Sequence, residues 1–117
     1  MKKIYHLSTC DTCKRIINTL NITNDFELQD IKTQAISESQ INEMKALAGS
    51  FKNLFSKRAR LYKELGLKEK TLTEEDYKNY ILEHYTFLKR PVIIYNTAIF
   101  IGNSKKTVEA AKLAIHE

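Results

Sequence analysis

The chain contains few residues of several kinds, and each scarcity excludes a class of protein. Its 117 residues include one proline, three glycines, two cysteines and no tryptophan. These counts exclude collagen-like and Pro/Gly-rich low-complexity chains, and two cysteines are too few for a scaffold held together by disulfides. There is no run of about 18 apolar residues to span a membrane, and polar Ser8 and Thr9 interrupt any signal-like stretch. We therefore expect a cytoplasmic protein that is not associated with a membrane.

The residues that are plentiful describe a folded globule. Apolar residues make up 43% of the chain and are evenly spread, which excludes a disordered protein. The length predicts a single domain over residues 1–117, which we expect to be a monomer. The net charge of +5 comes mainly from scattered lysines, and nucleic-acid binding needs clustered ones. We accordingly expect no direct contact with nucleic acid.

Hydrophobic periodicity predicts a β-α-β unit, a block of helices and a final β-β-α unit. Two capping boxes, Ser37 with Gln40 and Thr73 with Asp76, mark the starts of helices inside the block. The block therefore forms a helical insertion at about 36–88 within the single domain. The expected strands are 4–7, 26–31, 91–95 and 98–101, and the flanking helices begin after Cys10 and Ser104.

The sequence Cys10-Asp11-Thr12-Cys13 lies where the first strand passes into a helix. Free N–H groups and the positive end of the helix dipole stabilise a thiolate at a helix N-terminus. Cys10 is therefore the candidate nucleophile, and Cys13, one turn further, is placed to resolve a mixed disulfide. Half of a zinc site that also includes His6, or two inert buried thiols, are the alternatives.

The three histidines differ in their expected roles. His6 ends the first strand, four residues before Cys10, where an imidazolium would favour the thiolate. An ordinary histidine at the end of a strand is the alternative for His6. We expect His84 to lie on a helix face, and His116 to be a frayed-end residue.

Two basic clusters offer candidate substrate-binding residues. Arginine binds oxyanions and carboxylates bidentately, so Arg58 or Arg60, together with Arg90, is a candidate for holding an oxyanion or the carboxylates of a thiol cosubstrate near Cys10. A solvated basic helix face is the alternative, above all for Arg60. Pro91, the only proline, belongs at the start of its strand because it cannot donate a hydrogen bond to a sheet. Pro91 and Thr12 complete the candidate substrate-binding set.

Together these motifs resemble the ArsC/Spx family over essentially the whole chain. The resemblance implies an α/β protein with a thioredoxin-like fold and a small mixed sheet, in which the helical block is the family's insertion. The residues that carry it are Ile4-Tyr5-His6 before Cys10, Lys14-Arg15 after it, Lys57-Arg58, Tyr62-Lys63-Glu64-Leu65-Gly66-Leu67, Leu88-Lys89-Arg90-Pro91-Val92-Ile93-Ile94 and the hairpin that ends at Gly102.

The resemblance implies an arsenate reductase-like thiol oxidoreductase that uses no bound cofactor. In the glutaredoxin-coupled enzymes of the family, the cysteine matching Cys10 attacks arsenate, and the histidine matching His6 assists its ionisation. The arginine matching Arg90 precedes a cis proline, and glutathione with glutaredoxin, or thioredoxin, supplies electrons. The family's remaining arginines fall at Gly102 or a neighbour and nearer Ser56 than Arg58 in this chain.

Cys13 is a further departure, because those enzymes carry serine or another residue there. A CxxC motif is instead found in Spx, a regulator that uses it as a redox switch and binds the C-terminal domain of the RNA polymerase α subunit. Arg58 also matches the Spx pattern better. The alternative prediction is therefore an Spx-like regulator.

Overall fold

The computed structural model describes residues 1–117, which divide into two compact units. Unit 1 comprises Met1–Gln34 and Arg90–Glu117, and unit 2 comprises Ala35–Lys89. That the two units make up one domain with a helical insertion stays a prediction.

Unit 1 is built on a four-stranded mixed sheet in the order β2-β1-β3-β4. β1 pairs with β2 in parallel and with β3 antiparallel, and β3 pairs antiparallel with β4. The small mixed sheet expected from the sequence is thereby confirmed. The strands are β1 (Lys2–His6), β2 (Glu27–Asp30), β3 (Val92–Tyr95) and β4 (Ala98–Ile101).

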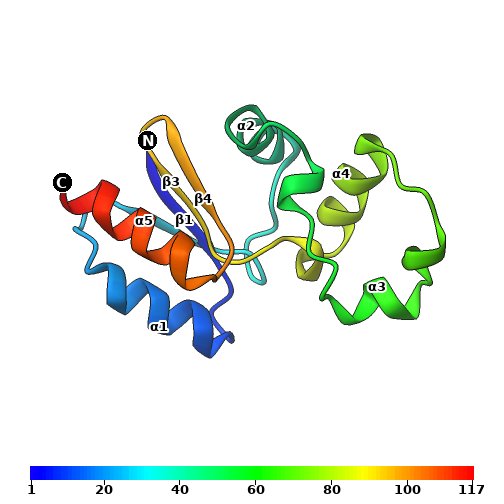
Figure 1. Ribbon diagram of the computed structural model, residues 1–117, viewed down its shortest axis with the longest axis horizontal. Helices are drawn as coiled ribbons and strands as arrows, with labels where there is room; N and C mark the ends of the chain where they lie inside the picture. Colours follow the sequence, from blue (N-terminus) through cyan, green and yellow to red (C-terminus); the bar gives the residue numbers. More distant parts are fainter. The chain divides into compact units, whose positions relative to one another are not determined.

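Two helices of unit 1, α1 (Asp11–Leu20) and α5 (Lys105–His116), lie side by side on one face of this sheet (Figure 1). Each Å² of apolar surface buried between these helices and the strands stabilises the unit by about 25 cal/mol. The core residues of this layer are Ile4, Ile16, Leu20, Phe26, Ile93 and Ala111.

Unit 2 is helical, and both predicted capping boxes are present. The Ser37 hydroxyl accepts a hydrogen bond from the Gln40 amide, and the Gln40 side chain accepts one from the Ser37 amide. Thr73 and Asp76 form the same reciprocal pair at the next long helix. The α-helices are α2 (Glu38–Ala48), α3 (Arg60–Glu64) and α4 (Glu74–Glu83), with 3₁₀ turns at Lys52–Leu54, Leu67–Glu69 and Tyr85–Phe87.

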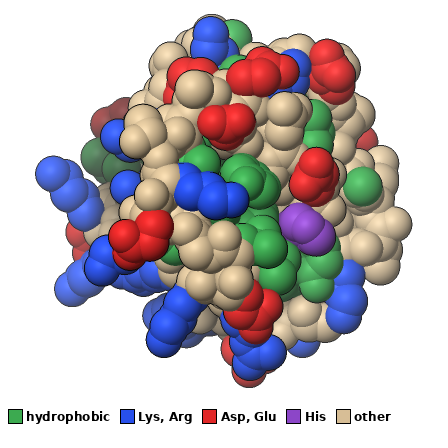
Figure 2. Space-filling model, turned by 90° about the vertical axis from the view of Figure 1, so that its right-hand side faces the viewer, with side chains coloured by type: hydrophobic (Ala, Val, Ile, Leu, Met, Phe, Trp, Pro, Cys, Tyr) green, Lys and Arg blue, Asp and Glu red, His purple; other side chains and the backbone are tan.

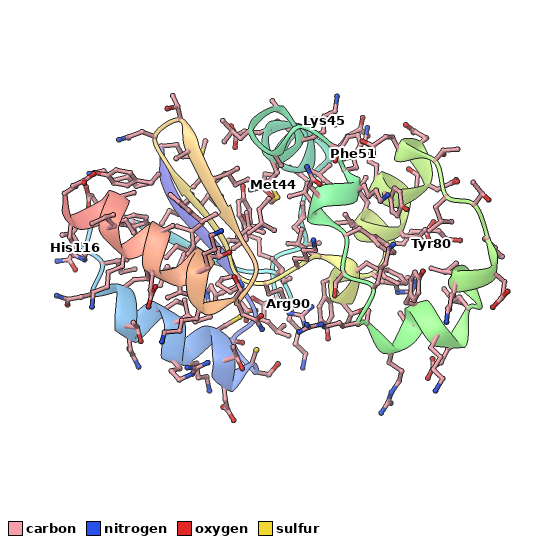
Figure 3. The ribbon with its side chains drawn as sticks, viewed as in Figure 1. Met44, Lys45, Phe51, Tyr80, Arg90 and His116 are labelled. Carbon is pink, nitrogen blue, oxygen red and sulfur yellow. The ribbon has the colours of Figure 1, made fainter.

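Aromatic rings form the centre of unit 2. Phe55 stacks on Phe87 with ring centroids 5.1 Å apart and meets Tyr77 edge-on at 4.9 Å. The ammonium groups of Lys45 and Lys78 each lie 5.8 Å from the centroid of the Phe51 ring, and Figure 3 labels Lys45 and Phe51. Unit 2 thus has its own packed interior.

Three residues lie in surroundings different from those expected. Leu28, an apolar residue in the expected strand 26–31, is 47% exposed, because β2 is an edge strand. His84 is not on a helix face, because α4 ends at Glu83 and His84 is its exposed C-cap residue. His116 is not frayed, because a ring nitrogen lies 2.6 Å from the carbonyl oxygen of Leu20.

The surface carries charges of both signs. Lysine and arginine alternate with aspartate and glutamate around an apolar strip on the face shown in Figure 2. None of the helices is both long and apolar enough to span a bilayer.

Candidate active site

Cys10 occupies the N-cap position of α1, at the end of the loop that leaves β1. Its backbone is extended (φ −96°, ψ 112°), and its carbonyl accepts the first helical hydrogen bond from the Lys14 amide at 3.1 Å. The Cys10 amide donates to the Leu7 carbonyl at 2.9 Å, which closes the loop into a tight turn. The Cys10 side chain is half-buried, so the thiol reaches the surface at the positive end of the helix.

Cys13 lies one turn further along α1 and has no exposed surface. Both cysteines are free thiols. The predicted arrangement, with one cysteine at the helix N-terminus and the second inside, is what the structure shows.

The pKa of Cys10 reflects opposing influences. Partial burial acts to raise it, but hydrogen bonds from the Cys13 amide, the Cys13 thiol and the Thr12 amide stabilise the thiolate, as does the positive charge of Arg90. Together they hold the pKa of Cys10 below its usual value. More of Cys10 is therefore nucleophilic thiolate at neutral pH than of an ordinary cysteine.

Cys13 is in the opposite situation. Burial, with the neighbouring Cys10 thiolate, raises the pKa of Cys13 to about 11. A thiol that keeps its proton donates a hydrogen bond to the Cys10 sulfur and is inert towards external reagents. The two thiols thus differ: Cys10 is half-buried with a lowered pKa, and Cys13 is buried with a raised one.

Arg90 and Pro91 open β3, and the peptide bond between them is cis, as the resemblance implies. Pro91 is buried, and its carbonyl accepts a hydrogen bond from the Gly102 amide at 3.0 Å. Arg90 is half-buried near the N-terminal end of α1 (Figure 3), where its charge acts on both cysteines. The only proline and the cysteines therefore lie in the same part of unit 1.

The other predicted site residues are placed differently. His6 is half-buried and pairs in register with Asp30, whose carboxylate is the group on which the His6 charge acts. The backbone amide of Thr12 donates a hydrogen bond to the Cys10 sulfur, which lowers the pKa of Cys10. Arg58 is exposed and belongs to unit 2, so its presence at the site stays a prediction.

No group of three or more histidine, cysteine, aspartate or glutamate side chains could hold a metal ion.

Two functional candidates, Ser8 and Asp30, were missed from the sequence. The Asp30 carboxylate, at the end of β2, accepts hydrogen bonds from the Ser8 hydroxyl at 2.5 Å and from the Ser8 amide at 3.2 Å. The two residues are 22 positions apart, so only the pairing of β1 with β2 brings them together. The sequence signal that could have found them is Asp30 itself, an aspartate at the end of the strand that pairs in parallel with β1.

A surface cavity of about 350 Å³ lies between α1 and α5. Its charged lining residues are Arg15, Lys105 and Glu109, and neither cysteine lines it. The cavity is separate from the thiol site.

The sequence is similar to a protein family and to a curated relative. The ArsC family matches residues 5–111, which include both cysteines and the Arg90-Pro91 pair. A curated arsenate reductase of Yersinia enterocolitica is 24% identical over 93 residues. The match covers 78% of this chain and 66% of that relative, slightly under two thirds of its length.

Solved structures show the same fold. An arsenate reductase from Vibrio cholerae superimposes with a TM-score of 0.77 at 19% identity, covering 97% of this chain and 96% of that one. A Bacteroides fragilis protein described as related to the ArsC family gives a TM-score of 0.78 at 22% identity, over 94% and 96% of the two chains.

Proposed function

Because this chain belongs to the ArsC family, we propose that it is an arsenate reductase-like thiol oxidoreductase whose nucleophile is Cys10. The observation that carries the proposal is the pair of unlike thiols, a half-buried Cys10 with a lowered pKa beside a fully buried Cys13. The matching curated relative, an arsenate reductase, supports the choice of chemistry.

For a disulfide substrate, the Cys10 thiolate attacks one sulfur, forms a mixed disulfide and releases the other sulfur as a thiolate. Cys13 then loses its proton and attacks the Cys10 sulfur. A Cys10–Cys13 disulfide forms, the second substrate thiol leaves, and two electrons have passed to the substrate. A dithiol donor such as thioredoxin or glutaredoxin, or two glutathione molecules, restores both thiols.

For arsenate, the Cys10 thiolate displaces one oxygen, which leaves as water, and forms a sulfur–arsenic bond. Attack of Cys13 or of glutathione on the Cys10 sulfur forms a disulfide and leaves the bond's electron pair on arsenic, which is reduced from As(V) to As(III). Arg90 holds the negative charge, and Arg58 is the second arginine predicted for this role. The Thr12 amide donates a hydrogen bond to the Cys10 thiolate. Pro91 belongs to the substrate-binding set beside Arg90, and a protonated His6 would favour the Cys10 thiolate.

A turnover assay tests this function. We expect wild-type protein to reduce arsenate or a mixed disulfide with either glutathione and glutaredoxin or thioredoxin, and Cys10→Ser to show no rate above background. Asn18→Ser, an exposed substitution on α1, is the matched control and should retain the wild-type rate. Absence of turnover with every donor and both substrates would remove the enzymatic function.

The CxxC motif favours one alternative, an Spx-like redox switch that binds the C-terminal domain of the RNA polymerase α subunit. In this function Cys10 and Cys13 form a disulfide that changes partner binding instead of turning over. Binding measured with reduced and oxidised protein tests it. An affinity that does not change with Cys10 oxidation would exclude the switch.

A further inference from the structure

Asp30 is tied by its carboxylate to the loop that carries Cys10. One carboxylate oxygen accepts the Ser8 hydroxyl at 2.5 Å, and the other accepts the Ser8 and Lys32 amides, each at 3.2 Å. These bonds lower the pKa of Asp30, the Ser8 hydroxyl contributing most, so the carboxylate is ionised at neutral pH. An ionised acceptor makes hydrogen bonds about twice as strong as a neutral one.

Ser8 lies in the short loop between the buried Leu7 and the N-cap Cys10. Ser8 and Thr9 lie between the end of the buried run at Leu7 and the N-cap at Cys10, and the Leu7–Cys10 backbone bond spans them. The carboxylate of Asp30, at the end of β2, holds both the amide and the hydroxyl of Ser8 within this turn. The amides of Thr12 and Cys13 stabilise the Cys10 thiolate only if the turn aims the sulfur at them.

We infer that Asp30 and Ser8 are positioning residues that hold the Cys10 turn in the geometry of a stabilised thiolate. The inference rests on the proposed function, in which Cys10 is the reacting thiol. Asp30 acts through Ser8 and touches no substrate.

A simple charge effect makes the opposite prediction. A carboxylate near a thiol disfavours the thiolate, so removing the negative charge of Asp30 would by itself lower the pKa of Cys10 and speed its reaction. Loss of positioning would raise the pKa and slow it. The sign of the change therefore separates the two roles.

The experiment measures alkylation of Cys10 by iodoacetamide from pH 5 to 10, with each cysteine followed by mass spectrometry of its peptide. The variants are Asp30→Asn, Ser8→Ala and the double variant, and far-UV circular dichroism reports whether each is folded. Asp25→Asn is the matched control, because Asp25 also accepts side-chain hydrogen bonds in unit 1, from Lys2 and Thr23.

Positioning predicts that Asp30→Asn and Ser8→Ala each slow alkylation at pH 7 by roughly threefold or more, equivalent to half a unit of pKa. The double variant should be no slower than the slower single variant, because the two residues act through one contact. Asp25→Asn should match the wild type.

Unchanged or faster alkylation in folded Asp30→Asn and Ser8→Ala would overturn the inference, as would additive effects in the double variant. The wild-type profile separates this failure from that of the proposed function. If Cys10 reacts first in the wild type and the variants do not differ, only the positioning role fails. If wild-type Cys10 does not react preferentially, the proposed nucleophile fails.

Discussion

At the scale of single residues, the site depends on two identical side chains in unlike surroundings. Cys10 meets helix amides and the Arg90 charge, while Cys13 is enclosed in the core. The sequence predicts this contrast because a CxxC motif at the start of a helix places one cysteine at the N-cap and the next a turn inside. It does not predict the Ser8–Asp30 bond, which depends on which strand pairs with β1.

Arg90 provides the first test at this scale. Replacing Arg90 with Gln removes a positive charge that favours the Cys10 thiolate, so the pKa of Cys10 should rise and its alkylation at pH 7 should slow by roughly threefold. The pH profile of alkylation measures the change.

Arg90→Lys is the matched control, because it keeps the charge, and it should retain most of the wild-type rate. Equal slowing in both variants would show that the guanidinium shape, not its charge, is what Cys10 needs.

At the scale of elements, helix starts could be read from local sequence and helix surroundings could not. Both capping boxes were predictable because each depends on two residues three positions apart. Local sequence predicts a frayed end at His116, since its contact, the Leu20 carbonyl, is 96 positions away and cannot be foreseen from neighbouring residues. Leu28 is exposed because β2 is at an edge of the sheet, which follows only from the strand order.

The start of α2 provides a test of capping. Ser37→Ala removes the hydroxyl that accepts the Gln40 amide, so the free energy of unfolding should fall by about 1 kcal/mol. Urea denaturation measures it. Ser39→Ala, an exposed substitution two residues further in the same helix, is the control and should change stability far less; equal losses would show that the cap contributes nothing.

The C-terminal end of α5 provides a second test at the scale of elements. His116→Ala removes the contact with the Leu20 carbonyl, so amide hydrogen exchange should become faster in the last turn of α5. Leu113→Ala, at a residue 63% exposed in the same helix, should leave exchange there nearly unchanged. Protection that survives in His116→Ala would mean that apolar packing alone holds the helix end.

At the scale of the whole molecule, each unit has its own interior. Unit 1 packs α1 and α5 on the sheet, and unit 2 packs aromatic rings between its helices. The predicted site residues are divided between the two units. The cysteines, His6 and Arg90 belong to unit 1, and Arg58 belongs to unit 2.

If the chain is one domain, the units should unfold together. We expect amides of α1 and of α4 to lose protection at the same urea concentration in hydrogen exchange read residue by residue. Two separate midpoints would contradict the single-domain prediction and would leave Arg58 on an independently folding part.

The claim on which the proposed chemistry depends is that Cys10 is ionised where Cys13 is not. The most direct measurement is the pH dependence of alkylation of each cysteine in the wild-type protein, resolved by peptide. Because the pKa of Cys10 lies below its usual value and burial with the neighbouring Cys10 thiolate raises the pKa of Cys13 to about 11, Cys10 should be alkylated much faster than Cys13 at pH 7. Alkylation of the two cysteines at similar rates, or a Cys10 midpoint above that of an ordinary cysteine, would contradict the claim.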